Sequence, residues 1–303
     1  MVAFTASSKR AQSRRRLVLQ TSAKVNLVLE VLNKRSDGYH EISTVMQSVD
    51  LFDRLTFESA PAISLEVDDP SLPTGEENLV VRAARLLQRA SCVNEGATIR
   101  LTKHIPVAAG LGGGSSDAAA TLLGLNQLWR LRWPRARLIE LAGRLGMDVP
   151  FFLAGGPALA TGRGEEIRRL TAVGSYALVL VNPRVALSTR EVYERVPKDW
   201  QAEPGATRRL MDALRTRNAL RVAAALANTL ERFVMPSVPA VSHMKAALLA
   251  AGALGTAMSG SGPTVFGIAR SLDQARQIRQ RVTRRDWSSW AVRTHSGPAI
   301  RWV

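Results

Sequence analysis

Apolar residues in the first half of the chain follow two different periods. A period of two residues, which is typical of half-buried strands, is clearest where Ile63, Leu65 and Val67 share one face. Elsewhere apolar residues recur at helical spacing with arginines between them, as on an amphipathic helix. The pattern predicts strands over residues 17–31, 62–67 and 98–105, and helices over residues 76–90, 118–129 and 137–145.

The second half of the chain shows the same mixture without strict alternation of strand and helix. The pattern predicts strands over residues 177–181, 256–258 and 264–268, and helices over residues 208–233 and 237–251. This arrangement indicates an α+β protein in two halves that meet near residues 160–170. We expect a first domain over residues 17–165, a second over residues 166–303, and a basic, disordered tail over residues 1–16.

The segment between Pro106 and Ala120 carries the clearest chemical signal. A predicted strand leads into four closely spaced glycines, and an alanine-rich helix follows them. Glycine permits positive φ angles and removes side chains that would block a ligand. Backbone N–H groups at the start of a helix attract anions. The segment therefore predicts a phosphate-binding loop.

Two widespread phosphate loops do not fit this segment. The pattern G-x-x-x-x-G-K-[ST] requires a lysine that is absent here. The pattern G-x-G-x-x-G would need glycine at position 115, which is serine, so a dinucleotide-binding fold is excluded as well.

Composition narrows the class of protein further. The single cysteine, Cys92, can form no internal disulfide, so a reducing, cytoplasmic location is expected. The four histidines lack zinc-binding spacing, and no apolar run is long enough to span a membrane. The net charge of +16 suits nucleic acid, an anionic surface or a polyanionic small substrate, although a general arginine bias would also produce it.

Five segments, in order, resemble motifs of the GHMP kinases. Met147 departs from the small residue usual beside Asp148, and Thr229 stands where aspartate is usual; neither change removes a group that the chemistry requires. The segments are residues 22–27 (SAKVNL), 35–41 (RSDGYHE), 106–120 (PVAAGLGGGSSDAAA), 146–152 (GMDVPFF) and 258–266 (MSGSGPTVF).

The resemblance implies a two-domain GHMP kinase fold with the active site in the cleft between domains, and it implies ATP and Mg²⁺ as cofactors. Asn78 and Lys103 are expected to reach adenine, and the magnesium ligands stay open. The ATP loop is expected to comprise Pro106, Val107, Ala108, Ala109, Gly110, Leu111, Gly112, Gly113, Gly114, Ser115 and Ser116.

The resemblance also implies the catalytic pair. Asp148 is expected to accept the proton of the substrate hydroxyl, and Lys24 to stabilise its charged form. Without the resemblance, Asp148 at its turn suits a helix cap equally well, and Lys24 suits an exposed strand face. Asn26 lies two residues beyond Lys24, so in a strand both side chains face the same side, and Asn26 is expected to contact the substrate.

The segment around Tyr39 and His40 resembles one branch of the family. Members of that branch phosphorylate the C2 hydroxyl of 4-CDP-2-C-methyl-D-erythritol in the non-mevalonate isoprenoid pathway. A cytosine base requires a stacking ring and polar contacts at its edge. The resemblance assigns these roles to His40, Tyr39 and Tyr193, although a surface histidine and a packing tyrosine remain alternatives.

The expected partner is therefore a small molecule that carries a cytidine diphosphate group, with no membrane and no specific nucleic acid. A GHMP kinase for mevalonate or homoserine is the nearest alternative, because it would keep the glycine loop. A nucleic-acid-binding protein is suggested by charge alone, and the three tyrosines offer few stacking surfaces. The chain is expected to be a monomer or a homodimer.

Overall fold

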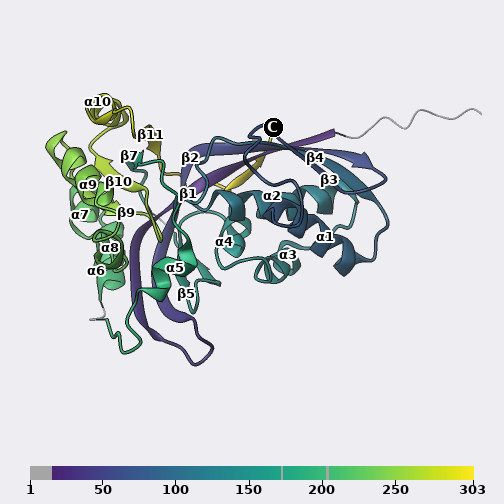
Figure 1. The fold of residues 1–303 in the computed structure, drawn as a ribbon, viewed down its shortest axis with the longest axis horizontal. Helices are drawn as coiled ribbons and strands as arrows, with labels where there is room; N and C mark the ends of the chain where they lie inside the picture. The colour runs from purple at the N-terminus through teal and green to yellow at the C-terminus, as the bar shows by residue number, and fades with distance from the viewer. Residues whose placement is uncertain (1–15, 172, 203–204) are drawn as a thin grey trace, which may run out of the picture.

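A computed structural model describes residues 16–171, 173–202 and 205–303. The predicted basic tail therefore lies outside the described residues except for Arg16. Two sheets with their helices lie next to each other along the long axis of the molecule, and strands β1 and β2 run between them (Figure 1). The predicted α+β class is confirmed.

The larger sheet has eight strands, and its main path runs β12-β1-β2-β4-β3. Strands β1 and β2 form a long antiparallel hairpin whose turn projects from the body of the molecule (Figure 1). The strands of this sheet are β1 (Arg16–Lys34), β2 (His40–Ala60), β3 (Ser64–Val67), β4 (Gly96–Thr102), β5 (Ala158–Thr161), β6 (Glu166–Arg169), β8 (Ala227–Asn228) and β12 (Ile300–Trp302).

Helix α2 is central to the first half, because it packs on β1 and β2 and contacts α1, α3 and α4. Small buried residues on α2, including Ala118, Ala119 and Ala120, allow this close packing. Asn78 begins α1 by accepting a hydrogen bond from the backbone N–H of Val80 at 3.0 Å. The helices are α1 (Leu79–Ser91), α2 (Gly113–Leu128), α3 (Arg135–Ala142) and α4 (Val149–Ala154).

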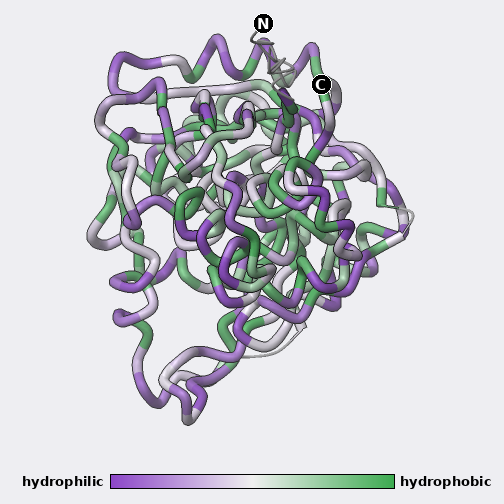
Figure 2. Tube along the Cα trace, turned by 90° about the vertical axis from the view of Figure 1, so that its right-hand side faces the viewer, coloured by the Kyte–Doolittle hydropathy of each residue, from purple (hydrophilic) through white to green (hydrophobic). Residues whose placement is uncertain are grey.

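The second half contains a four-stranded antiparallel sheet in the order β11-β7-β10-β9. Hydrophobic segments gather inside the molecule and hydrophilic ones follow its outer turns (Figure 2). The elements are β7 (Ala177–Asn182), α5 (Thr189–Glu194), α6 (Ala206–Arg215), α7 (Ala219–Ala224), α8 (Glu231–Val234), α9 (Ala240–Ala250), β9 (Gly255–Met258), β10 (Val265–Ala269), α10 (Leu272–Val282) and β11 (Ser288–Arg293).

The two halves share strands and core. β8 and β12 both come from the second half, yet both pair with β1 in the larger sheet. One hydrophobic cluster joins Val25 and Leu27 of β1 to Leu180 of β7 and Phe266 of β10. The division near residue 165 stays a prediction about independent domains. Within the described residues, no helix has the length and apolar character that crossing a bilayer requires.

One sequence prediction is wrong at the level of elements, and one long strand was missed. Residues 208–233 form three helices and a short strand instead of one helix, because Asn218 caps a new helix through Leu220 and Arg221, and β8 pairs with β1. The long strand β2 was not predicted. Its buried polar residues interrupt the apolar pattern: Thr44, Gln47, Ser48, Asp53 and Thr56.

Candidate active site

A cavity of about 1080 Å³ lies where the glycine loop, the β1–β2 hairpin, α4 and α5 meet. Nearly every residue that the sequence assigned to the site lines it. From outside the loop these are Lys24, Asn26, Tyr39, His40, Asn78, Lys103, Asp148 and Tyr193; from the loop they are Pro106, Val107, Ala108, Ala109, Gly110, Gly112, Gly113, Gly114 and Ser115.

Leu111 and Ser116 lie outside the cavity lining. Leu111 is fully buried in the core, and its carbonyl accepts a hydrogen bond from the Lys24 backbone at 3.0 Å. The Ser116 hydroxyl donates to the Ser22 carbonyl at 2.7 Å, and the Ser116 backbone N–H donates to Gly112 at 2.9 Å. The assignment of these two residues to the ATP loop stays a prediction, and in this structure these hydrogen bonds lie within the fold.

The glycine loop fits a phosphate group in shape and polarity. Gly110 has φ +74°, and a Cβ there would lie 2.1 Å from the Ser259 carbonyl oxygen. Gly112 has φ +71° and caps α2, so the backbone N–H groups of residues 113–115 have no partner within the helix. A helix of 16 residues adds a positive dipole end at this place. The loop can therefore hold an anion by its backbone.

Lys24 and Asp148 form an ion pair at the edge of this loop. The Lys24 ammonium lies 3.2 Å from Asp148 Oδ2, with the lysine side chain 4% exposed and the aspartate 36% exposed. The ammonium also donates to Asn26 Oδ1 at 2.7 Å. Asp148 precedes α4, whose early proline, Pro150, suits the first turn of a helix. The pair presents one accessible carboxylate to the cavity beside a fixed positive charge.

A second loop, Ser259–Gly262, holds this arrangement from the other half of the chain. The Ser259 hydroxyl donates to the Gly110 carbonyl at 2.8 Å and accepts from the Asn26 backbone at 3.3 Å. Asn228 donates to the carbonyls of Met258 and Gly260, at 2.8 Å each. The loop thus ties strand β1 to the glycine loop.

The hairpin end of the cavity carries aromatic rings. The rings of His40 and Tyr193 have centroids 5.5 Å apart at 35°, and His40 Nε2 is buried without a partner among the described residues. Burial, with help from the positive charge of Lys34, lowers the pKa of His40, so its ring is neutral at pH 7. Burial, followed by the charge of Asp148, raises the pKa of Tyr193. Tyr39 is 51% exposed.

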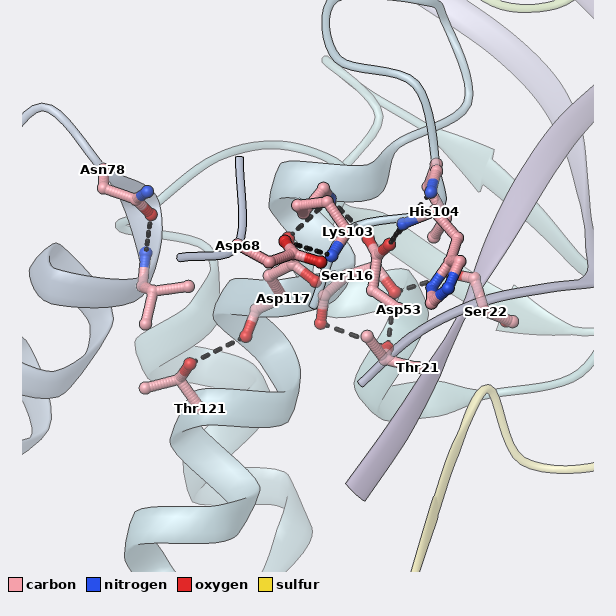
Figure 3. Close-up of polar contacts among 12 residues, drawn as sticks. Thr21, Ser22, Asp53, Asp68, Asn78, Lys103, His104, Ser116, Asp117 and Thr121 are labelled. Carbon is pink, nitrogen blue, oxygen red and sulfur yellow. Dashed lines mark hydrogen bonds and ion pairs between the residues drawn. The ribbon is translucent and has the colours of Figure 1, made fainter. Parts of the chain in front are cut away.

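Several residues of the site were missed by the sequence analysis. Thr44 accepts a hydrogen bond from Asn26 at 2.8 Å, and the Arg163 guanidinium lies 5.0 Å from the centre of the Tyr39 ring. Asp53 and Asp117 both pair with Lys103 (Figure 3). Thr44 and Asp53 belong to the strand that the apolar pattern did not reveal. Asp117 lies inside the glycine motif, but the sequence analysis assigned no role to its side chain.

The fit for magnesium is limited. Within residues 16–171, 173–202 and 205–303, no three His, Cys, Asp or Glu side chains are grouped so as to hold a metal ion. Magnesium that accompanies a nucleotide is usually held by phosphates and waters with few protein ligands, so the cavity is compatible with it.

Family models match both halves of the chain. The model described as the GHMP kinases N terminal domain matches residues 78–156, and the GHMP kinases C terminal model matches residues 210–288. Together with the relatives below, these matches show that the chain belongs to the GHMP kinase family.

Named relatives are more specific. The chain is 49% identical, over 90% of its length and 96% of the relative's, to the 4-diphosphocytidyl-2-C-methyl-D-erythritol kinase of Pelotomaculum thermopropionicum. A crystal structure of 4-(cytidine 5'-diphospho)-2C-methyl-D-erythritol kinase matches with TM-score 0.79 and 35% identity, covering 93% of this chain and 100% of that one. A homoserine kinase from Cytophaga hutchinsonii shares the fold, with TM-score 0.77 at 20% identity over the full length of both chains.

Proposed function

We propose that this chain transfers the γ-phosphoryl group of ATP to the C2 hydroxyl of 4-CDP-2-C-methyl-D-erythritol, in the non-mevalonate pathway to isoprenoid precursors. The observation that carries the proposal is one cavity that joins three parts. A glycine loop suited to phosphates lines it, the His40–Tyr193 ring pair lines its hairpin end, and the Lys24–Asp148 ion pair lines it as well.

The ion pair connects the two ligand ends. Carbon atoms of Lys24 lie 3.1 Å from the place that a Cβ on Gly112 would take, so the lysine borders the phosphate loop. Asp148 lies close enough to Tyr193 for its charge to raise the pKa of that phenol. A substrate hydroxyl bound at Asp148 would thus lie between a nucleotide on the glycine loop and a cytosine base beside the rings of His40 and Tyr193.

The chemistry follows from these positions. The substrate oxygen attacks the γ-phosphorus while the bond to the ADP oxygen breaks, and Asp148 accepts the hydroxyl proton. Lys24, 3.2 Å from Asp148, places a positive charge beside the carboxylate and stabilises negative charge on the transferring group. The loop N–H groups hold the remaining phosphates. Magnesium supplies charge neutralisation on the phosphate oxygens when bound.

The aromatic end supports a cytosine base over a small alcohol. A neutral imidazole can both donate and accept a hydrogen bond, which suits the edge of cytosine, and the Tyr193 ring offers a stacking face. Asn78 and Lys103 stay predicted contacts of the nucleotide. In this structure the Asn78 side chain also caps α1, and Lys103 is held by two carboxylates.

An assay of ADP release tests the function directly. Purified protein is given ATP and magnesium with the CDP-methylerythritol substrate, mevalonate or homoserine as alternative acceptors. We expect turnover with the CDP compound alone. Turnover of mevalonate or homoserine in its place would keep the kinase chemistry and reject the cytidine pocket.

We also propose a cytoplasmic location, supported by the single cysteine, which fits a reducing compartment.

A further inference from the structure

A buried cluster of three charged residues adjoins the glycine loop (Figure 3). The Lys103 ammonium lies 2.8 Å from Asp117 Oδ2 and also pairs with Asp53. The side chains of Lys103, Asp53 and Asp117 are 8%, 0% and 3% exposed. Charges that are this deeply buried are costly unless each is paired. Two carboxylates therefore share one ammonium at a place where solvent contributes little.

The cluster also fixes the chain that enters the loop. Asp53 Oδ1 accepts the backbone N–H groups of His104 at 2.6 Å and Ile105 at 2.9 Å. Asp68 accepts the backbone N–H of Lys103 at 3.0 Å. Asp53 thus links strand β2 to the residues that lead into the glycine loop, and together with Asp68 it fixes the backbone from Lys103 to Ile105.

The Lys103 ammonium stands against the first turn of α2. It lies 3.2 Å from the place that a Cβ on Gly113, the first residue of the helix, would occupy. Lys103 and Asp117 both line the cavity. An ammonium has three N–H donors, and within the described residues two of them go to Asp53 and Asp117. The third is available to a ligand at the helix start.

The cluster has a net negative charge when both carboxylates are ionised, because Lys103 supplies a single positive charge. Burial, partly offset by Lys103 and reinforced by Asp53, raises the pKa of Asp117 to about 7. Asp117 Oδ1 is buried and has no hydrogen-bond partner among the described residues. As a carboxylate, that oxygen repels a phosphate chain, whereas a protonated carboxyl group could donate a hydrogen bond to a nucleotide.

Other charged groups lie around the same part of the cavity. They belong to the ends of β3 and β4, the segment before α1, strand β1 and the start of α4. In that order they are Asp68, His104, Glu77, Lys24 and Asp148.

We propose that Asp53 and Asp117 are positioning residues of the nucleotide site, which hold the Lys103 ammonium at the first turn of α2, and that Asp117 is protonated while nucleotide is bound. The inference rests on the proposed ATP site. A polyanion placed beside the cluster disfavours a second negative charge there, so binding takes up a proton from solvent. Nucleotide affinity then falls as the pH rises through the titration of Asp117.

Calorimetric titration of ADP with magnesium, from pH 6 to pH 8, tests this coupling. Each titration is run in two buffers of different ionisation enthalpy, so that proton uptake is measured. For the wild type we expect the Kd to rise about tenfold over this range, because Asp117 titrates near pH 7 in the free protein. In Asp117→Asn, which keeps the shape but cannot ionise, this rise should be absent, and the difference in proton uptake should approach one at pH 8.

The ionisation of ADP itself is common to both proteins and cancels in the comparison. Asp212→Asn is the matched control, because it removes a carboxylate from the exposed Arg215 pair on α6 and should behave as the wild type. Equal pH dependence in wild type and Asp117→Asn, or loss of binding in Asp117→Asn at every pH, overturns the inference. Wild-type protein that binds no nucleotide at any pH would reject the ATP site itself.

Asp53→Asn tests positioning separately from folding. It should raise the KM for ATP by a larger factor than it lowers kcat, because the lysine loses its anchor while the catalytic pair remains. A purely structural role would reduce the folded fraction, which lowers kcat in proportion and leaves the KM of the remaining enzyme unchanged. The latter result, with a lowered melting temperature, would contradict a positioning role for Asp53.

Discussion

The charge of Asp148 is the feature of a single residue on which the proposed reaction depends most. The carboxylate is partly exposed to the cavity and lies 3.2 Å from the Lys24 ammonium. Asp148→Asn keeps the size of the side chain and removes its basicity. We expect kcat to fall by about two to four decades. ADP binding, measured by calorimetry, should be nearly unchanged, because the loop N–H groups are untouched. Turnover close to that of the wild type would remove Asp148 from the role of base.

His40 governs recognition of the substrate base in this proposal. Its ring lies against Tyr193, and its Nε2 is buried without a partner among the described residues. His40→Ala should raise the KM for the CDP substrate roughly 10- to 100-fold, the effect of losing one or two buried polar contacts. The KM for ATP should stay the same in steady-state assays. His243→Ala, at an exposed position on α9, is the control and should change neither constant.

The pH dependence of substrate binding is a separate test of His40. Its pKa is lowered in the folded protein, chiefly by burial and also by the charge of Lys34. The ring should therefore stay neutral from pH 8 down to its ordinary titration range near pH 6.5. We expect the KM for the CDP substrate to rise only below that range, and this rise should disappear in His40→Ala. A KM that rises between pH 8 and pH 7 in the wild type alone would contradict a lowered pKa.

Some site residues could be predicted from the sequence because local geometry was enough. Lys24 and Asn26 are two residues apart in a strand, and both line the cavity as that spacing requires. Asp53 and Thr44 could not be predicted in this way. They are polar residues buried inside a strand, and only partners distant in sequence, such as His104 and Asn26, make their burial acceptable.

The same limit applies to secondary-structure elements. Helices with clear apolar faces, such as α1 and α9, were predicted within a few residues. The helix predicted over residues 208–233 failed because its breaks depend on a cap at Asn218 and on pairing of Ala227 with Val28 across the sheet. The first of these signals is local and was overlooked. The second is not contained in the segment at all.

Glu30 gives a prediction at the scale of an element, the start of helix α6. Its carboxylate accepts the backbone N–H groups of Gly205, Ala206 and Thr207 at 2.7–2.9 Å. Burial alone would raise the pKa of Glu30, but hydrogen bonds from the start of α6, with those from Thr207 the largest, lower it below the ordinary value of 4.5. Glu30→Gln should reduce the free energy of unfolding in urea at pH 7 by roughly 1–3 kcal/mol.

The pH dependence gives the sign of this effect. A lowered pKa means that Glu30 stabilises the fold above about pH 4.5 and that this contribution is lost as the pH falls through the folded pKa. The difference in the free energy of unfolding between wild type and Glu30→Gln should therefore become smaller as the pH is lowered. A gap that stays constant from pH 7 to pH 4 would mean that the charge of Glu30 does not stabilise α6.

At the scale of the whole molecule, the halves on either side of residue 165 share strands and a hydrophobic cluster. β12 pairs Ile300 with Thr21 and Trp302 with Leu19, while the hydroxyl of Thr21 donates to the Ser116 carbonyl at 3.2 Å in α2. Strand β12 thus supports strand β1, on which helix α2 packs. With a shared core as well, we expect unfolding to involve both halves together.

Urea unfolding with two probes tests this unity. Far-UV circular dichroism reports on the whole chain, and tryptophan fluorescence reports on residues in both halves, such as Trp129 and Trp287. The two transitions should coincide, and ADP should shift both to higher urea by the same amount.

A fragment ending at residue 165 should show no cooperative transition, because it lacks β12, β8 and the apolar residues that cover Val25 and Leu27. A fragment that unfolds cooperatively would instead establish the first half as an independent domain. Strands β8 and β12 would then join the two halves without being required for the first half to fold.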